Sequence, residues 1–162
     1  MTTIILYTRR NVGLYALSYL KAKGYNVKVL TDDHWVSRMA KWLDVEEVTI
    51  GSMGEYDYFF SVHGVEFIPM EYLKEGKSIN FHPCLSIGYK GHNPIKRYIK
   101  DKQVHATIDA HYMTNEIDEG EIIDTVSFAT GRVRGYAEFY NIAVPMYYLC
   151  FEQVLLKLNI KP

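Results

Sequence analysis

The chain has 162 residues, of which 48% are hydrophobic, so it can bury a substantial core within one domain. Its 18 basic and 19 acidic residues nearly balance, which leaves no overall field for nucleic acid or a membrane surface. The N-terminus has no basic segment followed by a long apolar run, and no stretch approaches the roughly 20 apolar residues of a spanning helix. We therefore expect one cytoplasmic domain over residues 1–162, with neither a membrane nor a nucleic acid as partner.

The first part of the chain predicts alternating strands and helices. Residues 3–8 (TIILYT) have the pattern of a buried strand, and Asn11 is the expected N-cap of a helix that ends near Gly24. Residues 26–31 (NVKVLT) predict a second strand, followed by a helix over about 33–43.

The middle of the chain predicts further strands. Residues 57–62 and 78–82 read as buried strands, and their alternation with helices implies parallel strands joined by helical crossovers. Residues 105–113 and 121–128 predict two longer strands connected by a loop at 115–120. We expect this second half of the sheet to be antiparallel or mixed.

Two helices complete the prediction. A short one is expected from Pro94 to Lys102, because proline suits the first turn of a helix. A long one is expected from Tyr136 to Leu158, with an apolar stripe that covers the sheet and a proline, Pro145, in its interior. The predicted fold class is α/β, with a mixed, mostly parallel sheet flanked by helices.

Polar side chains that suit proton transfer lie near the end of the strand at 78–82. Asn80 and His82 are two residues apart, so strand alternation places both side chains on one face. His111 and Asp118 add an imidazole and a carboxylate from a later segment. An amide, an imidazole and a carboxylate are the groups needed for proton transfer beside a stabilised oxyanion. Asp118 can join the others only if the strand at 105–113 neighbours the strand at 78–82, and we predict that adjacency.

The two stretches INFHPCLSIGYKGHNPI and TIDAHYMTNEIDEGEII resemble the catalytic domain of formyltransferases that use 10-formyltetrahydrofolate. That family includes glycinamide ribonucleotide, methionyl-tRNA and amino-sugar formyltransferases. His111 precedes Asp118 by seven positions and Asn80 precedes it by 38, as in the family pattern. The match is firm over residues 57–124. The matching residues are Asn80, His82, Pro83, Leu85, Tyr89, Gly91, Pro94, His111, Met113, Asp118, Gly120 and Ile122.

The resemblance implies a single Rossmann-like formyltransferase domain whose formyl donor is 10-formyltetrahydrofolate. It assigns catalysis to Asn80, His82 and Asp118: the first two would donate hydrogen bonds to the tetrahedral oxyanion, and Asp118 would orient His82. It also implies that the segment GVEFIP holds the pterin of the donor, and the alternative is an ordinary loop at the exit of a strand. The residues assigned to that donor site are Gly64, Val65, Phe67, Ile68 and Ile117.

Several residues are candidates for binding the amine acceptor. Arg9 and Arg10 precede a predicted helix N-terminus and would grip a phosphorylated substrate, although exposed, solvated arginines are commoner. Tyr89, Lys90 and His111 are further substrate-binding candidates, and His111 would alternatively support the loop without taking part in chemistry. The chain departs from the family pattern beside these residues, at Cys84, Ser86, Ile87 and Lys90.

The expected acceptor is the primary amine of a small molecule. The first loop, TRRNVG, has one glycine where glycinamide ribonucleotide enzymes have a glycine-rich phosphate loop. Methionyl-tRNA enzymes append an RNA-binding domain, whereas this sequence ends soon after the predicted C-terminal helix, so we do not expect a tRNA acceptor. A nucleotide-linked amino sugar is therefore the preferred acceptor. Two alternatives remain: hydrolysis of formyltetrahydrofolate, and a silent homologue that binds folate or nucleotide without transfer.

Other sites and partners have less support. The remaining histidines form no ligand set for a metal hydrolase, and Cys84 and Cys150 lack metal-pair spacing, so we expect no metal and two reduced thiols. Fourteen tyrosines would suit a homodimer surface or a platform that stacks a nucleobase, although core and half-buried positions explain most of them.

Overall fold

The fold is built on one seven-stranded sheet with the strand order β3-β2-β1-β4-β5-β6-β7. The computed structural model describes residues Met1–Pro162. Neighbouring strands from β3 to β5 are parallel, whereas β6 is antiparallel to both β5 and β7. This mixed, mostly parallel sheet confirms the predicted fold class. The strands are β1 (Thr3–Thr8), β2 (Asn26–Leu30), β3 (Glu46–Glu47), β4 (Tyr58–Val62), β5 (Ser78–Pro83), β6 (His105–Tyr112) and β7 (Ile122–Ala129).

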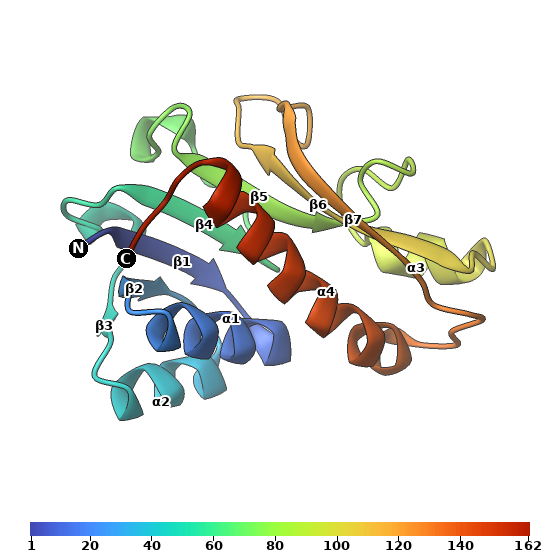
Figure 1. Ribbon diagram of the computed structural model, residues 1–162, viewed down its shortest axis with the longest axis horizontal. Coiled ribbons are helices and arrows are strands. Elements are labelled where there is room, and N and C mark those ends of the chain that lie inside the picture. Colours follow the sequence, from blue (N-terminus) through green and yellow to red (C-terminus); the bar gives the residue numbers. More distant parts are fainter.

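Four α-helices and two short 3-10 helices connect and cover the strands (Figure 1). The long C-terminal helix contacts β6 and β7 and crosses to the first helix, so it joins the two halves of the sheet. It runs without interruption through Pro145. The helices are α1 (Arg10–Ala22), α2 (His34–Trp42), α3 (Pro94–Lys100) and α4 (Tyr136–Lys157), with η1 (Ile50–Ser52) and η2 (Met70–Tyr72) in the loops.

One local prediction was wrong, and one short strand was not predicted. Asn11 does not cap α1, because the helix begins at Arg10 and Arg9 occupies the N-cap position without a side-chain hydrogen bond. Instead Asp33, which caps α2 through the backbone N–H groups of its first turn, also accepts a hydrogen bond from the backbone N–H of Arg10. The two-residue strand β3 was not predicted, because two exposed glutamates give no strand pattern.

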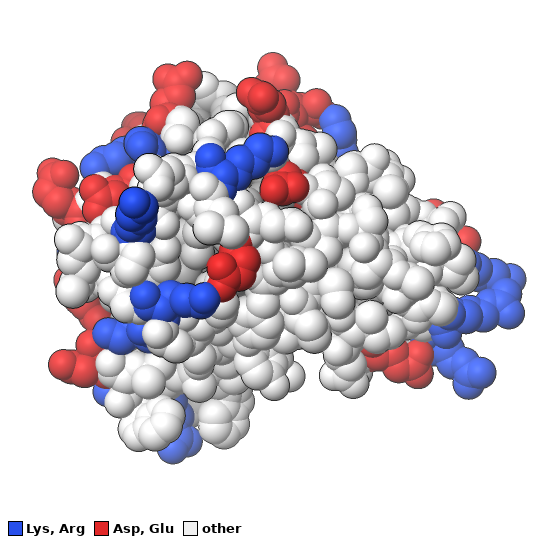
Figure 2. Space-filling model, viewed as in Figure 1, with Lys and Arg blue, Asp and Glu red and all other residues white.

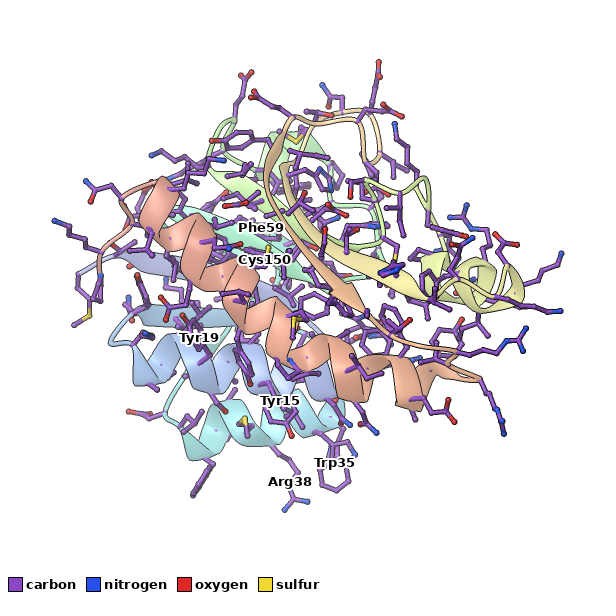
Figure 3. All side chains as sticks on the ribbon, turned by 45° about the vertical axis from the view of Figure 1, so that its right-hand side comes forward. Tyr15, Tyr19, Trp35, Arg38, Phe59 and Cys150 are labelled. Atoms are coloured by element: carbon purple, nitrogen blue, oxygen red, sulfur yellow. The ribbon has the colours of Figure 1, made fainter.

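The sheet separates two hydrophobic clusters of unequal size. The larger contains 34 buried residues and lies between the sheet and the helices. Figure 3 shows Tyr19 of α1 directed toward α4, where its ring lies 5.8 Å from that of Phe151, whereas Trp35 and Arg38 lie on the outer side of α2. The smaller cluster has eight buried residues on the opposite face of β1 and β4. That face, with less apolar cover, is where the polar residues of β5 and β6 lie.

Charged side chains of both signs are interspersed on the surface, and the middle of the face shown in Figure 2 is largely uncharged. No helix combines the length and the apolar character needed to cross a membrane.

Candidate active site

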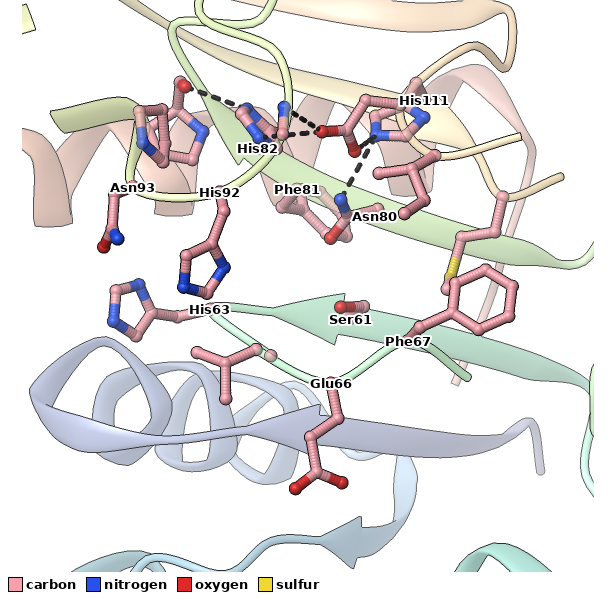
Figure 4. Close-up of a pocket in the computed structure, with 18 of the residues that line it drawn as sticks. Ser61, His63, Glu66, Phe67, Asn80, Phe81, His82, His92, Asn93 and His111 are labelled. Carbon is pink, nitrogen blue, oxygen red and sulfur yellow. Dashed lines mark hydrogen bonds and ion pairs between the residues drawn. The ribbon is translucent and has the colours of Figure 1, made fainter. Parts of the chain in front are cut away.

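Adjacent strands bring the predicted catalytic side chains together. β5 pairs with β6 in an antiparallel register that places Asn80 opposite His111 and His82 opposite Asp109. The predicted adjacency of these two strands is therefore confirmed. Opposed residues project from the same face of an antiparallel pair, so Asn80, His82 and His111 form one polar group on the face of the smaller cluster (Figure 4).

Two loops from opposite ends of β5 meet over this group. The loop at 84–93 follows the last residue of β5, and the loop at 113–121 starts beside its first residue, since the backbone N–H of Met113 donates to the Ser78 carbonyl. The Gly91 N–H donates to Asp118 Oδ2 at 2.7 Å. Asp118 has a φ of 57°, in the left-handed region, and the hydrogen bond from the facing loop supports this unusual conformation.

Both loops are anchored to the strands beneath them. The fully buried Asp109 of β6 accepts a hydrogen bond from the backbone N–H of Ser86 at 3.0 Å, which ties the first loop to the sheet. In the second loop, a Cβ on Gly120 would lie 1.7 Å from the carbonyl oxygen of Tyr112. Only glycine allows the chain to approach β6 this closely, and the position of Asp118 depends on this close approach.

One carboxylate serves two imidazoles at the centre of the site. His82 Nε2 lies 3.1 Å from Asp118 Oδ2, and His111 Nε2 lies 3.5 Å from Asp118 Oδ1. All three side chains are at least nine-tenths buried. Burial by itself raises the pKa of the Asp118 carboxyl, but hydrogen bonds from His111 and His82 outweigh it, so the pKa lies well below its ordinary value. Asp118 is therefore an ionised acceptor.

The neighbouring carbonyl groups fix the hydrogens of both rings. His82 Nδ1 lies 2.9 Å from the Pro83 carbonyl oxygen, and His111 Nδ1 lies 3.0 Å from that of Tyr112, so each Nδ1 carries a hydrogen and donates it. The contact of His82 Nε2 with the Asp118 carboxylate is attractive only when Nε2 carries a hydrogen as well. His82 and Asp118 then form an ion pair.

His111 holds the amide of Asn80. Asn80 Nδ2 lies 3.2 Å from His111 Nε2, so the Asn80 amide and the Asp118 carboxylate meet the same ring nitrogen. The Asn80 amide has no other partner in the protein, so it has a hydrogen available to a ligand. In contrast, both nitrogens of His82 already have partners, so its Nε2–H has to be shared between Asp118 and any bound group.

A cavity of about 510 Å³ adjoins the candidate catalytic group, within the usual range for small-molecule sites. Asn80, His82, His111 and Asp118 all line it. The five residues assigned to the donor line it as well, and three of them expose apolar side chains: Val65, Phe67 and Ile117. The residues from the loop after β4 are Gly64, Val65, Phe67 and Ile68, and Ile117 comes from the loop that carries Asp118.

The acceptor candidates are divided by the structure. Arg10 lines the cavity, as does His111, whereas Arg9 does not and pairs through its Nε with Asp32 at 2.6 Å. Tyr89 and Lys90 also lie outside the cavity lining. The Tyr89 hydroxyl donates to Asp101, and Lys90 forms a half-exposed ion pair with Glu119 at 2.8 Å, so both side chains have partners within the protein.

Sequence reasoning did not single out one end of the cavity. His63, His92 and Asn93 gather there, opposite the end occupied by Phe67 (Figure 4), and two tyrosines of the first turns of α4 complete the lining: Tyr136 and Tyr140. The position of His63 immediately after a buried strand was the one available signal.

His63 is held in an unusual state. Its φ is 61°, and the Tyr140 hydroxyl lies 3.1 Å from its Nδ1. Burial lowers the pKa of His63 to about 4, and the nearby guanidinium groups of Arg10 and Arg9 act in the same direction. The ring is therefore neutral near pH 7.

No group of three or more His, Cys, Asp or Glu residues is arranged to hold a metal ion. Cys84 and Cys150 are both buried and free, so the expectation of two unpaired thiols is confirmed. Burial raises the pKa of the Cys84 thiol to about 11 and that of Cys150 to about 12, so neither is a reactive thiolate at neutral pH.

Solved structures of several known proteins share this fold. Phosphoribosylglycinamide formyltransferase from Anaplasma phagocytophilum superposes with a TM-score of 0.78 at 17% identity, over 97% of this chain and 87% of that one. An N-formyltransferase from Helicobacter canadensis gives 0.73 at 23% identity, over 99% and 63%. A formyltetrahydrofolate deformylase from Pseudomonas putida gives 0.74 at 14% identity, over 95% and 64%.

These solved structures establish a shared fold, and this chain spans less than two thirds of the length of the last two. No curated protein sequence matches the chain. The sequence does match the family model described as formyl transferase over residues 3–129, which include both strands and both loops of the candidate site. The chain therefore belongs to the formyl transferase family.

Proposed function

We propose that this protein is an N-formyltransferase that transfers the formyl group of 10-formyltetrahydrofolate to a primary amine of a small molecule. The observation that carries the proposal is the convergence of Asn80, His82 and Asp118 on the wall of one cavity. These three side chains come from a strand and a distant loop, and they supply an amide donor, an imidazole donor and an ionised carboxylate at one place.

Exposed apolar residues in the cavity loops and the ligands of similar proteins support 10-formyltetrahydrofolate as the donor. The structure of the Helicobacter canadensis enzyme contains folinic acid, and that of a sugar 3N-formyl transferase contains 5-N-formyl-THF. In this chain Phe67, Val65 and Ile117 expose apolar surface to the cavity, which suits the flat face of a pterin. The donor end is then the end of the cavity that Phe67 occupies.

The reaction places one negative charge beside the catalytic group. The neutral amine attacks the formyl carbon, the formyl oxygen becomes an oxyanion, and the intermediate collapses by breaking the bond to N10 of the folate. The free hydrogen of the Asn80 amide and the Nε2–H of His82 donate to the oxyanion. Asp118 holds the His82 ring in the donating state while the proton of the amine passes to N10.

The acceptor belongs at the opposite end of the cavity, between His63 and the start of α4. Arg10 has no acidic side-chain partner there and would bind an anionic group such as a diphosphate. The Helicobacter canadensis structure contains dTDP-3-aminofucose, and the first loop of this chain lacks the glycine-rich form expected for glycinamide ribonucleotide. A nucleotide-linked amino sugar is the acceptor we propose.

The direct test is incubation with 10-formyltetrahydrofolate and a panel of nucleotide amino sugars and simple amines, with formylated products read by mass. Formylation of one amine, abolished by Asn80→Ala, supports the proposal. Incubation with donor alone is the control, since amine-independent release of formate identifies a hydrolase instead. Calorimetric binding of the donor with no product from any amine identifies a silent homologue.

A further inference from the structure

The loop at 64–68 runs along the cavity from His63 to Phe67 at the donor end (Figure 4), and its backbone is held to the protein by one side chain. The Tyr7 hydroxyl oxygen lies 3.0 Å from the backbone nitrogen of Glu66 and 3.3 Å from that of Val65, and accepts a hydrogen bond from each. The backbone of residues 64–68 makes no other hydrogen bond within the protein. The protein therefore holds the backbone of this loop by hydrogen bonds to a single hydroxyl group.

The ring of Tyr7 also sets how closely the loop approaches the sheet. A Cβ on Gly64 would lie 2.2 Å from a carbon of this ring, so the loop rests directly on it and position 64 requires glycine. The ring packs against Phe59 at a centroid distance of 6.4 Å and belongs to the smaller hydrophobic cluster with Ile68. The loop is thus fixed at its middle by the hydroxyl and at its end by Ile68.

Packing alone does not explain a tyrosine at this position. Tyr7 is only 6% exposed and its neighbours on the same face are apolar, so phenylalanine would bury a similar area. Phenylalanine would leave the two amides without a protein partner. The residue is almost fully buried and is not part of the cavity lining, so we expect it to act through the loop.

We infer that Tyr7 is a positioning residue for the formyl donor. Its hydroxyl uses the amides of Val65 and Glu66 and leaves the backbone N–H and C=O groups of Gly64, Phe67 and Ile68 free for the donor in a fixed arrangement. The inference rests on the proposed function, because it takes the loop to be the donor site. A preformed loop avoids an ordering cost on binding, so its loss weakens donor binding more than it slows chemistry.

The test is Tyr7→Phe, which keeps the ring beneath Gly64 and removes only the hydroxyl. We expect KM for 10-formyltetrahydrofolate to rise about tenfold, equivalent to about 1.4 kcal/mol, with kcat and the acceptor KM changed less than about twofold. Tyr25→Phe is the matched control, since the buried Tyr25 hydroxyl donates to the Ile160 carbonyl at 2.9 Å, away from the cavity. It should lower stability without changing KM for the donor.

Amide hydrogen exchange gives a second readout that needs no activity. Val65 and Glu66 should exchange slowly in the parent protein and at least about tenfold faster in Tyr7→Phe, with the amides of β1 and β4 unchanged. Unchanged exchange at both amides, or an unchanged donor KM, overturns the inference while formyl transfer itself stands. If the parent protein neither binds 10-formyltetrahydrofolate nor transfers its formyl group, the proposed function is wrong, and the role of Tyr7 in donor binding is wrong with it.

Discussion

Replacing Asp118 with asparagine tests the arrangement of the site most directly. Asparagine has nearly the same shape and tolerates a positive φ better than most residues, so the left-handed backbone at 118 is retained. Its oxygen can keep the bond from Gly91, whereas the charge that pairs with His82 at 3.1 Å is lost. The variant therefore removes one electrostatic partner and leaves the loop in place.

The expected loss follows from the role of that charge. Without the carboxylate, the Nε2 hydrogen of His82 is no longer stabilised, so one of two oxyanion donors is weakened. Loss of such a donor costs ~2.7 to 4 kcal/mol of transition-state stabilisation, which corresponds to a fall in kcat of about 100- to 1000-fold. Single-turnover formylation followed by mass measures this change. A folded Asp118→Asn protein with kcat within about threefold of the parent would refute the assignment.

The same variant has a pH-dependent effect on stability. Because the pKa of Asp118 is lowered on folding, the ionised carboxylate stabilises the protein above the unfolded-state pKa of about 3.9. This contribution is lost as the pH falls through the lower, folded-state pKa. The loss of one charge-assisted hydrogen bond should reduce the free energy of unfolding by about 1.5 to 3 kcal/mol between about pH 5 and about pH 8, and by less below about pH 4. Urea unfolding at several pH values measures the difference.

Three further perturbations probe the loops and the opposite end of the cavity. Gly120→Ala should lower activity by at least about tenfold and the free energy of unfolding by about 1 to 3 kcal/mol, because the added Cβ would collide with the backbone of Tyr112. Gly51→Ala is the control, since open space surrounds that position and neither quantity should change. Equal unfolding midpoints for the two variants would contradict this prediction. The folded-state pKa of His63 is about 4, below the unfolded value of about 6.5, so its buried neutral ring costs stability as the pH falls between these values. The parent protein should therefore lose up to about 3 kcal/mol more unfolding free energy than His63→Asn when the pH falls from about 6.5 to about 4. Identical curves of stability against pH for the two proteins would exclude the effect. Arg10→Ala should raise KM for an anionic acceptor about tenfold, because Arg10 lines the cavity. Arg9→Ala, which breaks a pair with Asp32, should change this KM less than about threefold. Equal effects of the two substitutions would refute the assignment of acceptor binding to Arg10.

Repeating patterns in the sequence predicted most of the fold. Buried strands such as β1 and β4 are short apolar runs, and α4 was predicted to within one residue because its apolar positions recur over many turns. Local exceptions escaped prediction. The strand β3 has two residues and no apolar pattern, and the start of α1 depends on Asp33, which is distant in sequence. Such contacts exist only after the chain has folded.

In the candidate site, too, local patterns were predictable and contacts between distant segments were not. Asn80 and His82 could be placed on one face from strand alternation alone, and the pairing of their strand with β6 followed from the predicted antiparallel half. The sharing of Asp118 by His82 and His111 could not be predicted, since it depends on how two loops meet. Tyr7 gave no signal either, because a tyrosine in a buried strand usually serves packing.

The unequal hydrophobic clusters on the two faces of the sheet have a consequence for how this chain can evolve. The 34 buried residues beneath the helices carry most of the apolar burial, whereas the cavity is bounded by loops above a cluster of only eight. Substitutions in those loops can reshape the acceptor end at little expense to the scaffold. New amine preferences can therefore arise by loop divergence while the fold is inherited unchanged.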